Sequence, residues 1–124
     1  MKEFSQKDIM EQNELEIKWK QVVSDLENKF GEDLSLDAII FMIGIDVLGK
    51  GRQKLTKDQK LDVMHIAVCH LLTPFGFYNF EGRDSEGWPH WSRAEKLPPL
   101  NGNQQESLMK EAIILYFEKD FSTI

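Results

Sequence analysis

The chain has 124 residues, of which 41% are hydrophobic and 29% are charged, and its formal net charge is -6. This length favours a single domain over residues 1–124 that buries a core without the help of disulfides or metals. The acidic balance disfavours binding of nucleic acid or of an anionic membrane over the whole surface, because both are negatively charged.

The cysteine count and the distribution of apolar residues point to a cytoplasmic location. Cys69 is the only cysteine, so an intramolecular disulfide is excluded and a reducing compartment is indicated. The first residues mix both charge signs and do not resemble a signal peptide. The most apolar stretch, residues 36–48, is too short to cross a bilayer and contains two aspartates. We therefore expect no membrane partner.

The first predicted helix covers residues 8–30, with Ser5 and Asp8 as a capping pair and Gly31 at its end. Its apolar residues recur at steps of three and four, which predicts one buried stripe on a charged surface helix. The stripe consists of Leu15, Trp19, Val22, Val23, Leu26 and Phe30. An alternative stays open for residues 1–33, in which this helix is peripheral and docks on a partner subunit.

Two central helices are predicted next. Residues 36–48 follow Ser35, a good N-cap, and are apolar on every side, so this helix should be the most buried element. Gly44 inside it is unfavourable by about 1 kcal/mol relative to alanine, and close approach of another helix would explain its presence. A third helix extends to residue 72 from a capping box formed by Thr56 and Gln59.

Residues 77–93 predict a β-hairpin, because two aromatic-rich segments flank the turn-forming residues 84–87. Pro89 lacks a backbone N–H and restricts the returning strand to a sheet edge. A last helix is predicted over residues 104–119. The expected fold is mainly α (α+β): a four-helix domain with a two-stranded antiparallel hairpin between the third and fourth helices.

Four titratable side chains are the candidates for chemistry. His65 and Cys69 are four residues apart on the third helix and share a face, but two ligands do not complete a metal site. A packed histidine beside a buried thiol is the favoured interpretation, and we expect no metal. Asp46 within an apolar helix is either a general acid or base, with His65 and His90 nearby, or a structural ion pair. It also lies only three residues before Gly49, where it can reach the end of the helix.

The loop of residues 50–54 forms a positive island on this acidic chain. Residues 49–60 contain five basic residues against Asp58 alone. Glycines beside Lys50 and Arg52, followed by a helix N-terminus, suit an anion, although the P-loop pattern is absent. A solvated basic turn is the favoured interpretation, because most runs of charged residues face water, and the anion site is the alternative.

The aromatic segment of residues 75–91 is the most unusual feature of the sequence. The favoured interpretation is a lid that packs on the helical core, and the alternative is a contact surface. The segment holds Tyr78, Trp88 and Trp91 beside His90, a combination that anchors interfaces or stacks on ligands. Trp88 and Trp91 are an odd number of positions apart, so an undistorted strand points them to opposite faces. One indole should then pack on the helices and the other should anchor a partner. A bulge near Gly87 would exchange the two faces.

Three segments together resemble a family of small uncharacterised bacterial proteins: residues 41–49 (FMIGIDVLG), 62–67 (DVMHIA) and 81–91 (EGRDSEGWPHW). The similarity covers roughly residues 34–117. The resemblance implies that these segments belong to one domain and that the source is bacterial. It implies no activity and no catalytic residue.

Two functions follow from these features. The first is a non-enzymatic interaction module that self-associates through the aromatic hairpin or the N-terminal helix, without a cofactor. The second is a small enzyme or an anion-binding protein that uses Asp46, His65 and His90 with the basic loop. Convergence of these three side chains on one cavity would favour the second function.

Overall fold

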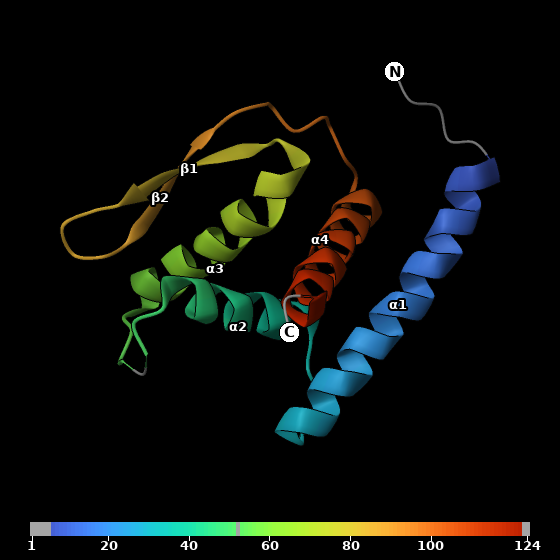
Figure 1. Cartoon of the computed structure of the whole chain (residues 1–124), viewed down its shortest axis with the longest axis horizontal. Coiled ribbons are helices and arrows are strands. Elements are labelled where there is room, and N and C mark those ends of the chain that lie inside the picture. The colour runs from blue at the N-terminus through green and yellow to red at the C-terminus, as the bar shows by residue number, and fades with distance from the viewer. Residues whose placement is uncertain (1–5, 52, 123–124) are drawn as a thin grey trace. The chain divides into compact units, whose positions relative to one another are not determined.

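The computed structural model describes residues 6–51 and 53–122 of the chain. These residues form four α-helices and a two-stranded antiparallel sheet that lies between the third and fourth helices in the sequence, as predicted (Figure 1). None of the described helices combines the length and the apolar character that a membrane span requires. The elements in chain order are α1 (Gln6–Phe30), α2 (Leu36–Leu48), α3 (Lys57–Leu72), the short 3-10 helix η1 (Thr73–Phe75), β1 (Tyr78–Arg83), β2 (Pro89–Arg93) and α4 (Gly102–Ser122).

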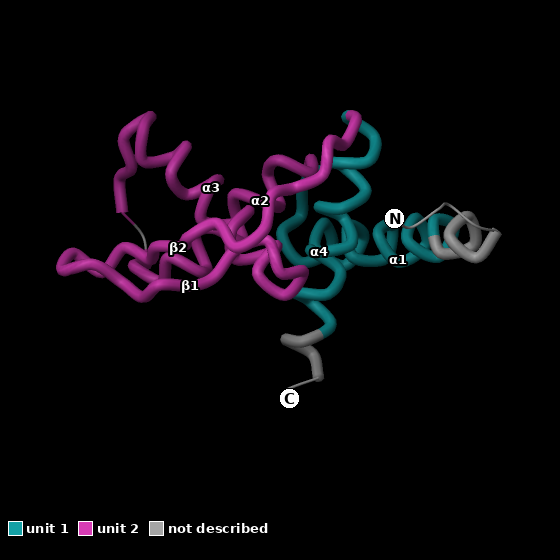
Figure 2. Tube along the Cα trace, turned by 90° about the horizontal axis from the view of Figure 1, so that it is seen from above, with its two compact units in different colours: residues 1–34, 102–124 teal, residues 35–101 magenta. Residues whose placement is uncertain are grey.

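The chain divides into two compact units, which Figure 2 shows in separate colours. Unit 1 combines residues 1–34 with residues 102–124, and unit 2 consists of residues 35–101. Each unit therefore has to be understood from its own packing. A single domain over the whole chain stays a prediction.

In unit 1, α1 and α4 pack side by side as parallel helices. Their contacts show this direction, because a later residue of α1 contacts a later residue of α4. Gln12 Nε2 donates a hydrogen bond to Ser107 Oγ over 3.2 Å, and Lys110 Nζ lies 3.5 Å from Glu16 Oε1. The same ammonium group lies 5.6 Å from the centre of the Trp19 ring, and Trp19 is buried. Trp19 is thus the apolar anchor of α1, covered by the stem and charge of Lys110.

The predicted stripe of α1 is confirmed in part. Trp19 is buried, and Leu15, Val22, Val23 and Leu26 are half-buried. Phe30 was wrongly included, since half of its surface is exposed (50%) where the helix ends at Gly31. Gly31 has a φ of 75°, the left-handed conformation expected after the last helical turn. Ser5, the predicted cap, lies outside the described residues.

In unit 2, α2 begins and ends where the sequence predicts. The Ser35 hydroxyl accepts a hydrogen bond from the backbone N–H of Ala38, and Gly49 adopts the left-handed conformation at the C-terminus. Gly44 lies against α3, and a Cβ at this position would come within 2.7 Å of Val63 Cγ1 and closer still to the Val63 carbonyl oxygen. The close approach predicted from Gly44 is therefore confirmed.

Helix α3 is as deeply packed as α2. Its capping box is present, with Thr56 and Gln59 exchanging hydrogen bonds between side chain and backbone. Six of its 16 residues are buried, and five of the 13 residues of α2 are buried. Helix α2, which was predicted to be the most buried element, is therefore buried to about the same extent as α3.

The hairpin runs back along α3, and its register contains one irregularity (Figure 1). Phe80 pairs with Trp91 and Gly82 pairs with His90, so Glu81 is an extra residue in β1. Such a bulge changes which side chains share a face beyond it. The irregularity lies in the first strand, whereas the sequence analysis considered only the effect that a bulge near Gly87 would have.

The prediction that one of Trp88 and Trp91 packs on the helices while the other points away from them is wrong. Both indoles are half-buried, and both pack against the buried cluster of Leu48, Val63 and Ile66. The alternation rule does not apply because Trp88 precedes β2 and lies in the turn, where Gly87 with a φ of 86° redirects the chain. Both rings therefore cover the helical core.

Candidate functional site

The tip of the hairpin is fastened to the end of α2 by Arg83, a residue that the sequence analysis missed. Its guanidinium donates to the carbonyl oxygens of Val47 and Leu48 over 2.8 and 2.9 Å, and to that of Gly87 over 2.8 Å. The last carbonyls of a helix lack intrahelical donors and carry partial negative charge, so a cation is favourable there. The absence of a basic residue in the last turn of α2 was the available signal.

Lys50 acts at the same junction rather than in a free anion-binding loop. Its ammonium donates a hydrogen bond to the Glu86 carbonyl oxygen and lies 5.8 Å from the centre of the Trp88 ring. Lys50 and Trp88 are thus brought together, and their contact helps hold the turn of the hairpin on unit 2. Arg52, the other predicted anion ligand, lies outside the described residues.

His90 is exposed and pairs with Asp84 across the turn. His90 Nε2 lies 2.8 Å from Asp84 Oδ2, while Asp84 Oδ1 accepts the backbone N–H groups of Glu86 and Trp88. The side-chain hydrogen bond with His90, and then the backbone hydrogen bond from Trp88, lower the pKa of the Asp84 carboxyl below its ordinary value. The Asp84 side chain therefore organises the turn as an anion.

The predicted trio of Asp46, His65 and His90 lies outside the unit 2 pocket that residues 41–60 form. Asp46 is exposed on α2, and none of the three side chains lines that pocket. His65 is also exposed. Its Nε2 atom lies 3.4 Å from Cys69 Sγ, and its ring forms a T-shaped pair with that of Tyr78. Among the residues described, no three His, Cys, Asp or Glu side chains are grouped closely enough to hold a metal ion.

Cys69 is a buried thiol with only 1% of its surface exposed. Burial disfavours the thiolate and raises the pKa of Cys69 to about 11. A thiol in this state is a poor nucleophile and a poor metal ligand, because both roles require the thiolate. The sequence interpretation of a buried thiol beside a histidine matches this environment, except that His65 is exposed rather than packed.

An aromatic surface follows the helix-facing side of the hairpin onto α3. We call it the aromatic rim and define it by His65, Tyr78, Phe80 and Trp91. The Phe80 and Trp91 rings meet edge to face at 5.3 Å between centres, and those of His65 and Tyr78 at 6.4 Å. Phe80 is 53% exposed although its partner Trp91 packs on the core. The rim therefore extends from the buried core to the exposed surface.

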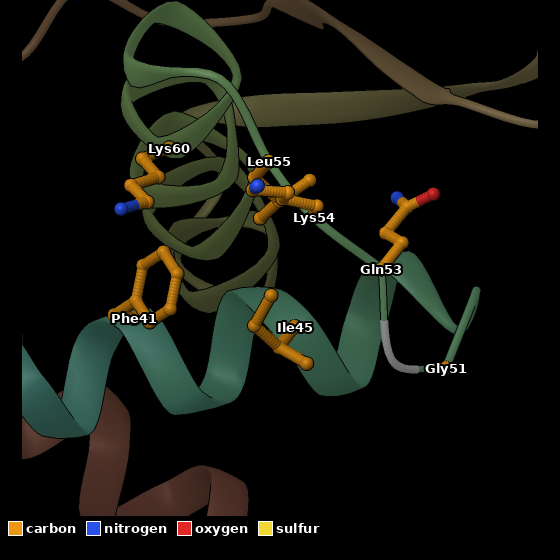
Figure 3. A pocket seen from close by; sticks show the side chains of 7 residues that line it. All are labelled: Phe41, Ile45, Gly51, Gln53, Lys54, Leu55 and Lys60. Atoms are coloured by element: carbon orange, nitrogen blue, oxygen red, sulfur yellow. The ribbon is translucent and has the colours of Figure 1, made fainter.

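A second surface feature lies between α2 and the segment that leads into α3. It is a pocket of about 560 Å³, here called the lysine groove, with Phe41 and Ile45 on one side and Leu55 on the other (Figure 3). Lys54 and Lys60 lie over these apolar side chains and are exposed. Gly51 and Gln53 complete the lining. Lys54 of the predicted basic loop is among the residues that line this pocket.

No family model matches the chain, and neither a curated protein nor a solved structure is significantly similar to it. The resemblance to a bacterial family stays a prediction, and both surfaces are interpreted from their own geometry.

Proposed function

We propose that this chain is a non-enzymatic interaction module that self-associates through the aromatic rim. The observation that carries the proposal is Phe80, which lies in the middle of a strand with half of its surface exposed and its ring against Trp91. Large aromatic side chains with one side on the core and one side in solvent supply much of the binding energy of protein interfaces.

The composition of the rim allows a second copy as the partner at this surface. Two copies of a protein with a net charge of -6 repel each other over most approaches. The rim contains neither a carboxylate nor a lysine, and its charged neighbour on this face is Arg93, the cross-strand partner of Tyr78. Two copies can therefore meet here without carboxylates in contact. A two-fold dimer brings the same patch of both subunits together, and an uncharged aromatic patch is complementary to itself.

The strand arrangement supports the same contact. The described sheet has two strands, so each strand has one edge without a neighbouring strand. Pro89 removes a donor from β2 and the extra residue Glu81 interrupts β1. Both features oppose pairing of strand edges, which leaves the aromatic face of the hairpin as the surface for a second copy. The buried lone thiol of Cys69 is compatible with the cytoplasmic location that we also propose.

Sedimentation velocity over a range of protein concentrations tests the proposal. Wild type should form a dimer whose population rises with concentration, and Phe80→Ser should weaken it by about tenfold or more, the loss expected for an interface aromatic. Asn79→Ser is the matched control, because Asn79 is the exposed neighbour on the opposite face of β1. Wild type that stays monomeric at every concentration, or equal weakening by both variants, would refute self-association through the rim.

A further inference from the structure

The lysine groove has the composition of a binding site for a molecule with an apolar body and an anionic end. Phe41, Ile45 and Leu55 each pack on the core cluster with one side and line the groove with another. Figure 3 shows the Phe41 ring directed toward Lys60 and the Lys54 side chain above Ile45. An apolar ligand placed here would displace water from three hydrophobic side chains and from two lysine stems.

The charged groups of the groove are cationic. Lys54 and Lys60 are exposed, so their ammonium groups keep their hydration until a partner arrives and impose no burial penalty on the empty pocket. The surrounding sequence strengthens the local positive field, since residues 49–60 contain five basic residues and one acidic residue. On a chain with a net charge of -6, this is the region that attracts an anion.

The size of the groove favours a small molecule over a protein segment. Its volume of about 560 Å³ falls within the range of small-molecule sites. Along α2 its apolar wall is formed by Phe41 and Ile45, which are one helical turn apart. A docked amphipathic helix needs a longer row of anchor positions, spanning about two turns.

We propose that the lysine groove binds a free amphiphilic carboxylate of the fatty-acid type. Its hydrocarbon chain packs on Phe41, Ile45 and Leu55, and its carboxylate accepts hydrogen bonds from the ammonium groups of Lys54 and Lys60. The head group stays at the mouth of the groove, where both lysines are in solvent. This binding site does not involve the aromatic rim, and its test is independent of self-association.

The test is titration of the isotope-labelled full chain with decanoate below its micellar concentration, followed by the methyl resonances of Ile45 and Leu55. These methyls should shift in a saturable way. Decanol, which has the tail without the charge, and acetate, which has the charge without the tail, should each bind about tenfold more weakly or not at all. Decanoate that produces no saturable shift of these methyls would overturn the proposal.

Lysine variants separate specific recognition from general electrostatics. Lys54→Gln combined with Lys60→Gln should weaken decanoate binding by about tenfold and leave decanol binding unchanged, while the fold is retained because both side chains are exposed. Lys57→Gln is the matched control, since Lys57 is an exposed lysine of the same helix start that does not line the groove. Equal weakening by the control would overturn the assignment of the two lysines. Binding to vesicles that contain phosphatidylglycerol, with no binding of monomeric decanoate, would assign the groove to a membrane surface instead.

Discussion

Replacement of Gly44 by alanine tests the packing of α2 on α3, which is the foundation of unit 2. In an isolated helix this change would be favourable by about 1 kcal/mol. In this protein the new methyl group would lie 2.7 Å from Val63 Cγ1 and closer still to the Val63 carbonyl oxygen. The side chain can change rotamer, but the carbonyl belongs to the hydrogen-bonded backbone of α3 and can retreat only if the helices separate.

The expected result is a net loss of stability. Overpacking a well-packed core costs about 1–3 kcal/mol, and separation of two helices also forfeits dispersion contacts along their whole crossing. After subtraction of the propensity gain, we expect Gly44→Ala to lower the free energy of unfolding by about 1–2 kcal/mol. For a chain of this length, that loss corresponds to a decrease in Tm of roughly 3–10 °C.

Thermal unfolding followed by circular dichroism measures this shift, and Gly102→Ala is the control. Gly102 is also helical, but a Cβ at that position meets nothing within 4 Å, so its Tm should be unchanged or slightly higher. The double variant Gly44→Ala/Val63→Ala sharpens the test, because it removes the clash with Cγ1 and keeps the clash with the carbonyl. A Tm for Gly44→Ala as high as that of Gly102→Ala would refute the close helix crossing.

Three further predictions concern the hairpin and the buried thiol. Arg83→Met should lower the free energy of unfolding by about 1–2 kcal/mol and speed hydrogen exchange in β1 and β2, because three carbonyl oxygens lose a cationic donor. The control Arg93→Met, on β2, should change hydrogen exchange little. The pKa of Asp84 is lower in the folded protein than the value near 3.8 of the unfolded chain. Its stabilising effect is therefore complete above that unfolded-state value and is lost as the pH falls through the folded-state pKa. The difference in Tm between wild type and Asp84→Asn should accordingly shrink only below about pH 4. Cys69, with a pKa of about 11, should react with iodoacetamide at pH 8 far more slowly in the native protein than in urea, and equal rates would contradict its burial.

The features that the sequence predicted correctly depend on neighbouring residues. Caps such as Ser35 and Thr56 act on backbone groups three residues away, so their effect can be recognised without knowledge of the fold. The helix stops at Gly31 and Gly49 require only a left-handed conformation at one position. Gly44 is a longer-range case, because its unfavourable propensity implied a compensating contact with an element that the sequence did not identify.

The features that the sequence analysis missed or misplaced depend on how the hairpin docks. The orientation of Trp88 follows from the turn that precedes β2, and the extra residue in β1 lies where no turn signal marks it. The contact of Arg83 with α2 joins residues 35 and 36 positions apart. No local pattern could pair them, and the missing basic residue in the last turn of α2 does not say which residue supplies the donor.

The candidate site was predicted by residue type and not by arrangement. Histidines, an aspartate and a basic loop are a plausible set for chemistry, but their side chains serve different neighbours in the structure. His90 orders a turn with Asp84, His65 meets Cys69 and Tyr78, and Lys50 holds the hairpin. Burial and pairing decide whether a titratable group is available, and both are properties of the folded chain.

The docking of the hairpin also explains why the exposed aromatic surface lies where it does. A two-stranded ribbon is marginally stable alone, so it must be fixed to the helices. Arg83, Lys50 and Trp88 provide this fixation at the turn, where the chain meets the end of α2. With the turn held in this way, Phe80 in the middle of β1 is not required to be buried for the hairpin to remain folded. An aromatic side chain that is exposed on a rigid strand is pre-organised for binding, because little conformational entropy is lost when a partner covers it.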